Sequence, residues 1–343
     1  MAIFSRSNRN KFLAVLFSTA LFTGLAIILV MALELPLERH AIVVLGIGLV
    51  VSLFEEFYIQ GHSGRWLRAM HPLKSIAIYS ALIASFSLVV MLLVHGLLGH
   101  QHQAAGGHGL HGTSWLMFIV MPELFAVSIV AIMTLRIIGY LGGSNLLDLM
   151  TGKYYRPILE QRIFLFLDIN GSTALVERLG PLEARALIGK FFFDISGPIA
   201  NHGGDIYRFT GDGVVAVWDW KEGVGNNRII RSVDAIRRIV ERESENYRAR
   251  FDCVPEYRIG IHGGPIVTSE EGDIKRAIGY YGDTIHIAAR LEQKAKELEV
   301  ECLLSGKVAA QLSDPGRRLK LIGKEAVRGT TDPIDIFELR PAA

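Results

Sequence analysis

The sequence predicts an N-terminal α-helical membrane domain followed by a cytosolic α+β domain of the split-βαβ, ferredoxin-like type. Half of the 343 residues are hydrophobic, and the mean hydropathy of +0.32 is too high for an ordinary soluble protein. This apolar excess lies before residue 140. After residue 161, short apolar runs alternate with helical patterns in the order βαββαβ and then αβ. That order is typical of an antiparallel-rich sheet with helices packed on it.

Four apolar segments precede residue 139, and each is long enough to cross a bilayer, which takes ~20 mainly apolar residues. Lysine and arginine concentrate before the first segment, between the second and third, and after the fourth. The positive-inside rule then places both chain ends in the cytoplasm. We therefore expect a multi-pass domain, residues 1–138, in the cell (inner or plasma) membrane, with the lipid bilayer as its partner. The predicted spans cover about residues 12–33, 40–58, 75–98 and 115–138.

The first of these segments also allows a different interpretation, because basic residues precede it as they precede a signal peptide. Its apolar stretch is longer than the usual ~7–15 residues of such a peptide, and further spans follow. The loop between the third and fourth segments, with its flanks, is rich in histidine and glycine. Clustered histidines bind metals or titrate near neutral pH, but they are also incidental in flexible polar loops. These histidines are His95, His100, His102, His108 and His111.

Residues 139–161 are expected to form a cytosolic connector. Glycines close the last span, Asn145–Met150 has the pattern of a short helix, and Gly152 and Pro157 interrupt it. The net charge of +2 does not favour a nucleic-acid partner. The two cysteines, Cys253 and Cys302, provide no disulfide framework and suit a reducing compartment.

The cytosolic domain, residues 162–343, opens with the stretch RIFLFLDINGSTAL. Its run of large apolar residues predicts a buried strand that ends at Asp168. Ser172 or Thr173 is expected to cap the next helix, which continues to Ala200 with a break at Gly180 and Pro181. A helix N-terminus attracts anions. A carboxylate beside an anion site indicates that a cation lies between the two.

The remaining elements follow in order. Two strand-like runs separated by Gly211-Asp212-Gly213 predict a tight hairpin with Asp212 at its tip. A strand within 257–268 is expected to be interrupted by Gly263-Gly264-Pro265. The other expected elements are strands at 205–210, 214–218, 301–305, 319–322 and 334–339, and helices at 228–248, 284–298 and up to 312.

In a split-βαβ sheet the first strand and the hairpin are neighbours, so Asp168 and Asp212 are expected to face each other. Two carboxylates in one place repel unless a positive charge separates them. Two oxygen-liganded divalent ions beside a phosphate-binding turn form a two-metal phosphoryl-transfer site. The sequence therefore predicts such a site at this strand end.

At this point the residues resemble the class III nucleotidyl cyclases, over about residues 160–340. Each matching motif is weak alone, but the four together, in this order and spacing, are specific. They read FLFLDINGST, GGDIYRFTGDGVVAVW, YRIGIHGGPI and GYYGDTIHIAARLE.

The resemblance implies a head-to-tail homodimer with active sites at its interface. Asp168 and Asp212, with the backbone of Ile169, match the ligands of two Mg²⁺ or Mn²⁺ ions, and Arg290 matches the arginine that stabilises the transition state. In the family these groups come from opposite chains. The ribose 3′-hydroxyl of a nucleoside triphosphate attacks the α-phosphate, and pyrophosphate leaves. The triphosphate is expected on the turn formed by Asn170, Gly171, Ser172 and Thr173.

Three positions depart from the adenylyl pattern of that family. Arg208 replaces a base-reading lysine, and its planar fork suits paired acceptors such as those of guanine. Gly279 stands where the lysine's partner usually has a side chain. His286 replaces an asparagine and retains the ability to donate a hydrogen bond to a ribose or phosphate oxygen. Arg208 could equally pair with a nearby acid, such as Asp205 or Asp283.

The expected function is a membrane-anchored adenylate cyclase that makes cyclic AMP from ATP. ATP is chosen because it is the family's commonest substrate. The first alternative is a guanylate or pyrimidine nucleotide cyclase, suggested by Arg208 and Gly279. The second is a catalytically silent receptor whose cyclase-like domain only binds nucleotide.

Overall fold

The structure is a computed structural model that describes residues 151–342, except 274–275, 314–317 and 326–332, together with scattered earlier positions. The chain divides into two compact units, one formed by Asn8–Leu141 and the other by Met1–Ser7 with Gly142–Ala343. The four expected spans fall outside the described residues, apart from isolated helical positions such as Thr23 and Ser80. The histidine-rich loop lies wholly outside them. Among the residues that are described, no helix combines the length and the apolar character needed to cross a membrane.

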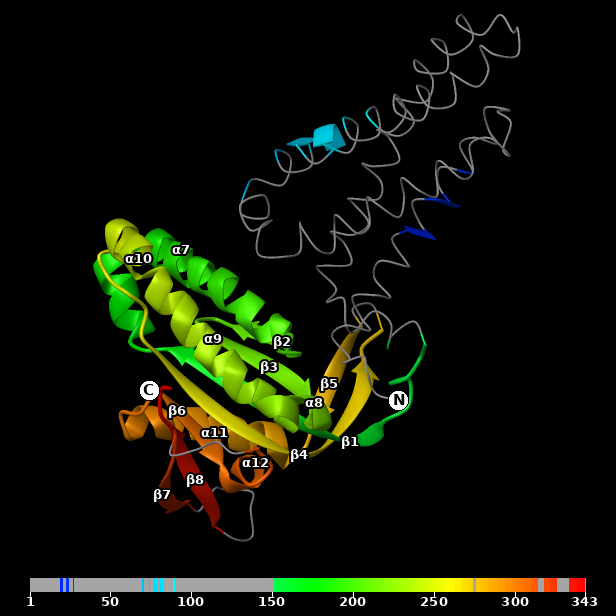
Figure 1. Cartoon of the computed structure of the whole chain (residues 1–343), viewed down its shortest axis with the longest axis vertical. Coiled ribbons are helices and arrows are strands. Elements are labelled where there is room, and N and C mark those ends of the chain that lie inside the picture. The colour runs from blue at the N-terminus through cyan, green and yellow to red at the C-terminus, as the bar shows by residue number, and fades with distance from the viewer. Residues whose placement is uncertain are drawn as a thin grey trace, which may run out of the picture. The chain divides into compact units, whose positions relative to one another are not determined.

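The second unit is built on an eight-stranded sheet in its described part, with the strand order β2-β3-β1-β4-β6-β8-β7 and with β5 paired to β4 (Figure 1). All neighbouring strands are antiparallel except β4 and β6, which are parallel. The strands are β1 (Ile158–Ile169), β2 (Asp205–Thr210), β3 (Gly213–Asp219), β4 (Tyr257–Glu271), β5 (Ala277–Tyr281), β6 (Cys302–Ser305), β7 (Leu319–Glu325) and β8 (Ile334–Leu339).

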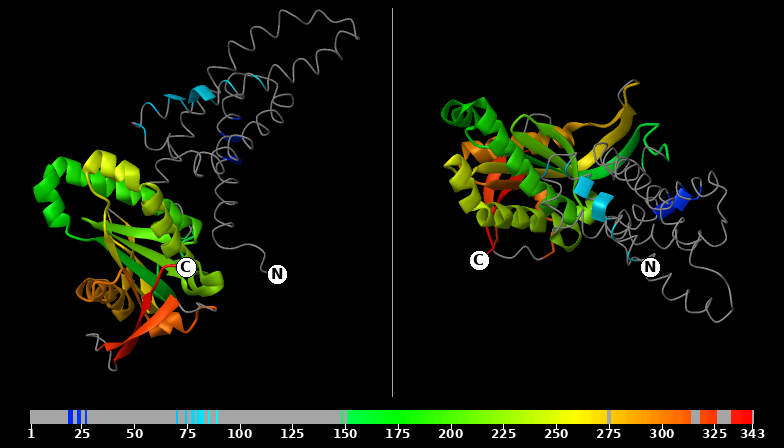
Figure 2. Two further views of the ribbon diagram at one scale, coloured as in Figure 1. Left: turned by 60° about the vertical axis from the view of Figure 1, so that its left-hand side comes forward. Right: turned by 90° about the horizontal axis from the view of Figure 1, so that it is seen from above.

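Helices cover both faces of this sheet. The long helices α7 and α9 pack together on one face, and α11 packs on β4 and β1 from the other (Figures 1 and 2). The described helices of this unit are α7 (Ser172–Asn201), α8 (Trp220–Val224), the 3-10 turn η3 (Gly225–Asn227), α9 (Arg228–Arg242), α10 (Ser244–Phe251), α11 (Asp283–Glu297) and α12 (Gly306–Ala309).

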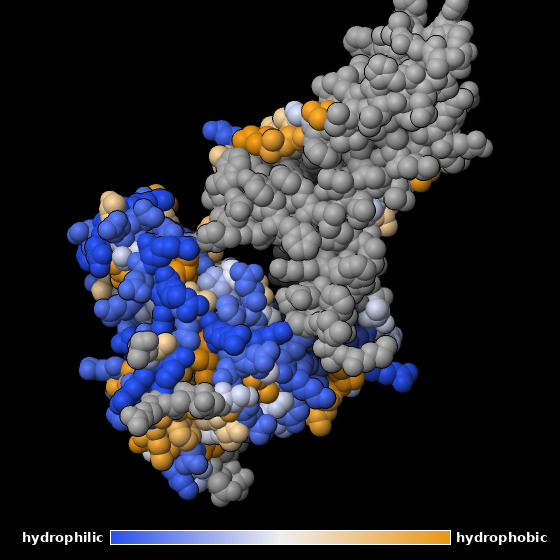
Figure 3. Space-filling view, in the orientation of Figure 1, coloured by the Kyte–Doolittle hydropathy of each residue, from blue (hydrophilic) through white to orange (hydrophobic). Residues whose placement is uncertain are grey.

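The surface of this unit is mainly hydrophilic in the view of Figure 3, with apolar patches among the polar side chains. Several large apolar side chains are strongly exposed, among them Tyr155, Leu159 and Leu182. Exposed apolar patches on a protein surface commonly mark contacts with partners.

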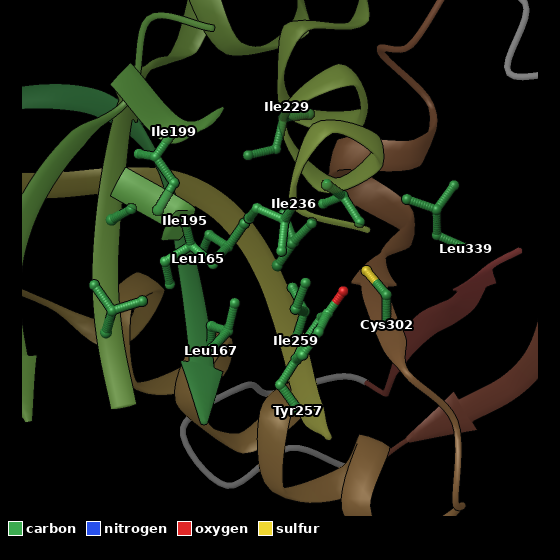
Figure 4. Packing of buried hydrophobic residues seen from close by; sticks show 14 of the residues in the cluster. Leu165, Leu167, Ile195, Ile199, Ile229, Ile236, Tyr257, Ile259, Cys302 and Leu339 are labelled. Atoms are coloured by element: carbon green, nitrogen blue, oxygen red, sulfur yellow. The ribbon is translucent and has the colours of Figure 1, made fainter. Parts of the chain in front are cut away.

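The core is organised by the alternation of side chains along β1. Ile163, Leu165 and Leu167 pack with α7 and α9 in the main cluster, whose centre is drawn in Figure 4. Phe164 and Phe166 belong to a smaller cluster on the opposite face, with Ala288 of α11. Because side chains alternate between the faces of a strand, Asp168 lies on the α11 face. This register decides where the proposed site is.

Most expected elements are present, but four details of the sequence interpretation were wrong. The connector ends earlier than residue 161, because β1 begins at Ile158. Neither Ser172 nor Thr173 caps α7; Gly171 is the N-cap, at φ 63°, and no side chain makes the capping bond. The helix expected over 228–248 is divided into α9 and α10 at Glu243. The strand β5 was not anticipated.

A fifth detail was also wrong, because the glycines at 263–264 do not interrupt β4. Gly263 lies in a continuous strand, and a Cβ added there would be 2.6 Å from the ring of Trp220. A Cβ at Gly264 would be 2.9 Å from Thr284 Oγ1, whose hydroxyl donates to the carbonyl of Pro265 at 2.7 Å. These glycines therefore allow close packing on a strand and do not mark a turn.

Candidate active site

Asp168 lies near the end of β1, beside the hairpin formed by β2 and β3. Asp168 pairs with Gly213 of β3 on one side and with Arg258 of β4 on the other. A Cβ added to Gly213 would lie 2.9 Å from Asp168 Oδ1. The absence of a side chain at Gly213 therefore leaves room for this carboxylate beside the hairpin.

Asp212 occupies that tip, between β2 and β3. Gly211 precedes it with φ 65°, a conformation that glycine adopts without strain. Arg185 of α7 donates a hydrogen bond to the carbonyl of Gly211 at 3.1 Å. The turn is thus held both by its own backbone and by a helix of the same chain.

The charge of Asp212 acts on Asp168. Burial, and next the charge of Asp212, raise the pKa of Asp168 to about 6, while Lys296 acts in the opposite direction. Glu292 lies in the same cluster, because burial and the charge of Asp168 raise its pKa to about 7. Acidic groups with raised pKa values in one place indicate a site that binds a positive charge.

A divalent metal fits this arrangement. Asp168, Asp212 and the carbonyl of Ile169 offer the oxygen ligands that Mg²⁺ prefers. Within the described ranges, no group of three or more His, Cys, Asp or Glu side chains is placed to hold a metal ion. Mg²⁺ usually keeps several waters and is also bound by phosphate oxygens of the substrate. Two carboxylates are therefore enough for Mg²⁺, whereas a closed structural metal site takes all its ligands from the protein.

The turn that follows Asp168 is fixed by β4. Asn170 donates its backbone N–H to the carbonyl of Glu256 at 2.8 Å. With the amide oriented so that its oxygen faces the guanidinium, Asn170 Oδ1 accepts hydrogen bonds from Arg258 Nη1 and Nη2 at 3.1 and 3.0 Å. Gly171 then turns the chain into α7, which starts at Ser172 and continues through Thr173. The first N–H groups of this helix are available to phosphate oxygens.

Arg290 and His286 lie one helical turn apart on α11, on a common face. His286 is exposed, whereas Arg290 Nη1 is buried and has no hydrogen-bond partner among the described residues. A buried guanidinium donor without a partner is costly, and an anion would satisfy it. Helical spacing turns Arg290 away from Glu292 and Lys296, which face Asp168.

At the opposite end of this region, a β-bulge between Ile206 and Arg208 places Arg208 on the same face as Tyr207. Its guanidinium lies 5.0 Å from the ring centroid of Tyr207, and Nη2 donates to the phenol oxygen at 3.2 Å. Gly279 lies in β5, opposite Ser269 of β4. Bulges commonly redirect side chains near functional sites.

Sequence reasoning missed four residues that shape this region. Arg185 and Arg258 hold the two turns, and each acts across a long separation in sequence that no local pattern reveals. Glu292 and Lys296 are four residues apart on one helical face, shortly after Arg290. That spacing was a usable signal, but the motif that contains Glu292 was interpreted only for Gly279, His286 and Arg290.

Part of the chain matches a known protein family. Residues 158–340 match the family described as "Adenylate and Guanylate cyclase catalytic domain". The chain belongs to this family. Members of the cyclase family with related sequences include Adenylate cyclase 2 of Rhizobium meliloti (strain 1021), 34% identical over 64% of this chain and 61% of that protein. Adenylate cyclase 1 of the same strain is 32% identical over 51% of this chain and 27% of that protein.

The chain therefore spans less than two thirds of the length of these two cyclases. Among solved structures, a bacterial light-regulated adenylyl cyclase superposes with a TM-score of 0.54 and 19% identity, over 64% of each chain. At that identity the match concerns the cyclase fold alone.

Proposed function

We propose that this protein is a membrane-anchored adenylate cyclase that converts ATP to 3′,5′-cyclic AMP and pyrophosphate. The observation that carries the proposal is the pair Asp168 and Asp212, brought together beside the N-terminus of α7. Membership of the cyclase family supports the reaction. The choice of ATP is supported by relatives that are themselves described as adenylate cyclases.

In this mechanism, Asp168, Asp212 and the Ile169 carbonyl would hold two Mg²⁺ or Mn²⁺ ions, which would supply positive charge against the triphosphate and favour ionisation of the ribose 3′-hydroxyl. The N–H groups at Ser172 and Thr173 bind phosphate oxygens. The 3′-oxygen forms a bond to the α-phosphorus as the bond to pyrophosphate breaks, and the hydroxyl proton passes to solvent. Arg290 donates to the oxygens on which charge develops, and His286 donates to a ribose or phosphate oxygen.

The site requires a second copy of the chain. Arg290 faces away from the side of α11 that carries Glu292 and Lys296 toward Asp168, so it serves the Asp168 of a partner chain. A symmetric homodimer with two shared sites satisfies both copies. The apolar side chains exposed on this unit are consistent with such an interface.

The test is to purify the full chain from membranes and supply each of the four nucleoside triphosphates with Mn²⁺ or Mg²⁺. We expect cyclic AMP and pyrophosphate in equal amounts. Recovery of the chain in the soluble fraction would contradict the membrane anchor. Absence of any cyclic product would instead favour a nucleotide-binding receptor.

A guanylate cyclase is the second candidate, and Arg208 is the observation that favours it. A guanidinium fork matches the paired O6 and N7 acceptors of guanine, and Gly279 offers no side chain to an adenine amino group. A clear preference for GTP in the same assay would establish this candidate and exclude the adenylate cyclase.

A further inference from the structure

The gap left by Gly279 is filled by the side chain of another residue. A Cβ added at Gly279 would coincide with Oε1 of Glu271, and the next nearest atoms belong to the same side chain. Glu271 comes from the end of β4, and Gly279 lies on β5, which pairs with it. The carboxylate therefore occupies the position that a side chain at residue 279 would otherwise take.

This carboxylate is part of a small polar group. The phenol of Tyr281 hydrogen-bonds to Glu271, which raises the pKa of Tyr281, and the phenol of Tyr207 is close enough to act in the same direction. Tyr207 in turn accepts the hydrogen bond from Arg208 described above. Arg208 therefore bonds to a tyrosine whose charge acts on Tyr281, the residue that bonds to Glu271.

The group is open to solvent on its outer side. Glu271 is exposed, and Tyr281 is 52% exposed. The group combines the Glu271 carboxylate, which accepts hydrogen bonds, with the Arg208 guanidinium, which donates them, and with aromatic rings. Side chains of these kinds bind the edge and the face of a nucleobase. The ring of Tyr207 is also packed edge-on against Tyr280, at 4.9 Å between centroids, which holds it in place.

We propose that Glu271 recognises the base of the substrate by accepting a hydrogen bond from the exocyclic amino group of adenine. This proposal rests on the proposed adenylate cyclase activity. Adenine presents its amino donor beside ring-nitrogen acceptors, so Glu271 accepts from the amino group while Arg208 donates to a neighbouring ring nitrogen. The absence of a side chain at Gly279 is what makes room for Glu271 to do this.

The decisive experiment compares ATP with purine riboside triphosphate, which lacks only the 6-amino group. For the wild type, we expect kcat/KM to be about 10–100-fold higher with ATP, the effect of one hydrogen bond to a charged acceptor. Glu271→Ala should remove most of this preference, chiefly by lowering kcat/KM for ATP. Glu271→Gln, which keeps one acceptor oxygen, should retain part of it.

Two further variants control the interpretation. Glu270→Ala alters the preceding glutamate, whose carboxylate pairs with Arg276 at 3.1 Å, and it should leave the preference intact. Gly279→Asp combined with Glu271→Ala returns a carboxylate from the neighbouring strand, and it should restore discrimination in favour of ATP.

An active wild type that does not discriminate between the two triphosphates would overturn the role of Glu271, as would an unchanged ratio in Glu271→Ala. A preference for GTP that depends on Glu271 would overturn the assignment to the adenine amino group. If the wild type makes no cyclic product from any triphosphate, it is the proposed activity that fails.

Discussion

The phosphate end and the base end of the proposed site are built in different ways. At the phosphate end, Asp168 and Asp212 are placed by strand register and a glycine turn, and Arg185 and Arg258 brace the two turns. At the base end, Arg208 and Glu271 are long side chains on the exposed edges of strands. Backbone geometry is costly to change, whereas an exposed side chain is not. We therefore expect substitutions to change the preferred base of the substrate more readily than the type of reaction.

The largest effect should come from breaking the phosphate end. We expect Asp212→Ala to lower kcat by at least about 10³-fold, because it removes a proposed ligand of the metal ions, whose positive charge would offset the negative charge of the triphosphate. Asp219→Ala is the matched control, since that aspartate accepts the backbone N–H of Lys221 at the start of α8. If Asp212→Ala retained wild-type turnover, the two-metal proposal would be wrong.

A second test asks whether the phosphate end is shared between chains. Asp168→Ala and Arg290→Ala should each be nearly inactive. A one-to-one mixture should recover about a quarter of wild-type activity, because half of the dimers carry one intact site of two. A mixture of Asp168→Ala with Asp212→Ala should recover nothing, since both changes affect the same half of the site. Equal activities of the two mixtures would refute the shared site.

A smaller effect should follow from moving the Asp168 carboxylate without removing it. The added methyl group in Gly213→Ala would meet Asp168 Oδ1 at 2.9 Å and push it from its place. We expect activity to fall about 10-fold, because catalysis is sensitive to small misplacements. Gly189→Ala introduces the same group where nothing lies within 4 Å and should be neutral. Equal activity of the two variants would show that this contact does not position the carboxylate.

The smallest effect concerns the fold around the site and is visible in the pH dependence. Burial lowers the pKa of His262 to about 4, and its Nδ1 is 2.7 Å from Ser305 Oγ. The unfolded chain binds the proton near pH 6.5, so stability is full above that pH and falls as the pH drops from 6.5 to 4. His262→Gln should reduce the loss in free energy of unfolding between pH 7.5 and pH 4.5 by an amount on the order of 2 kcal/mol.

Denaturant unfolding of the wild type and of His262→Gln at pH 4.5 and 7.5 measures this change. The variant separates the acid sensitivity of the fold from that of the carboxylates at the phosphate end. An unchanged slope between the two pH values would mean that His262 is not the group responsible.

Local patterns predicted the strand end near Asp168 and the hairpin tip at Asp212. The apolar run that ends at Asp168 and the Gly-Asp-Gly tip at Asp212 each need only a few consecutive residues to specify a strand end and a turn. The base end was predicted only in part. Arg208 and Gly279 were recognised as unusual, but β5 and the contact of Glu271 with Gly279 depend on the pairing of β4 with β5. Capping of α7 was also misjudged, since Gly171 leaves no side chain in the capping role.

The sequence by itself determined the order of the elements, the family resemblance and the two aspartates, because these are written in residues close together along the chain. Only the tertiary structure decided which side chains surround them. Gly260 lets the backbone of α11 lie directly on β4, and this contact brings Glu292 and Lys296 toward Asp168. Such proximity depends on how a helix packs on a strand distant in sequence, and no periodicity within either segment encodes it.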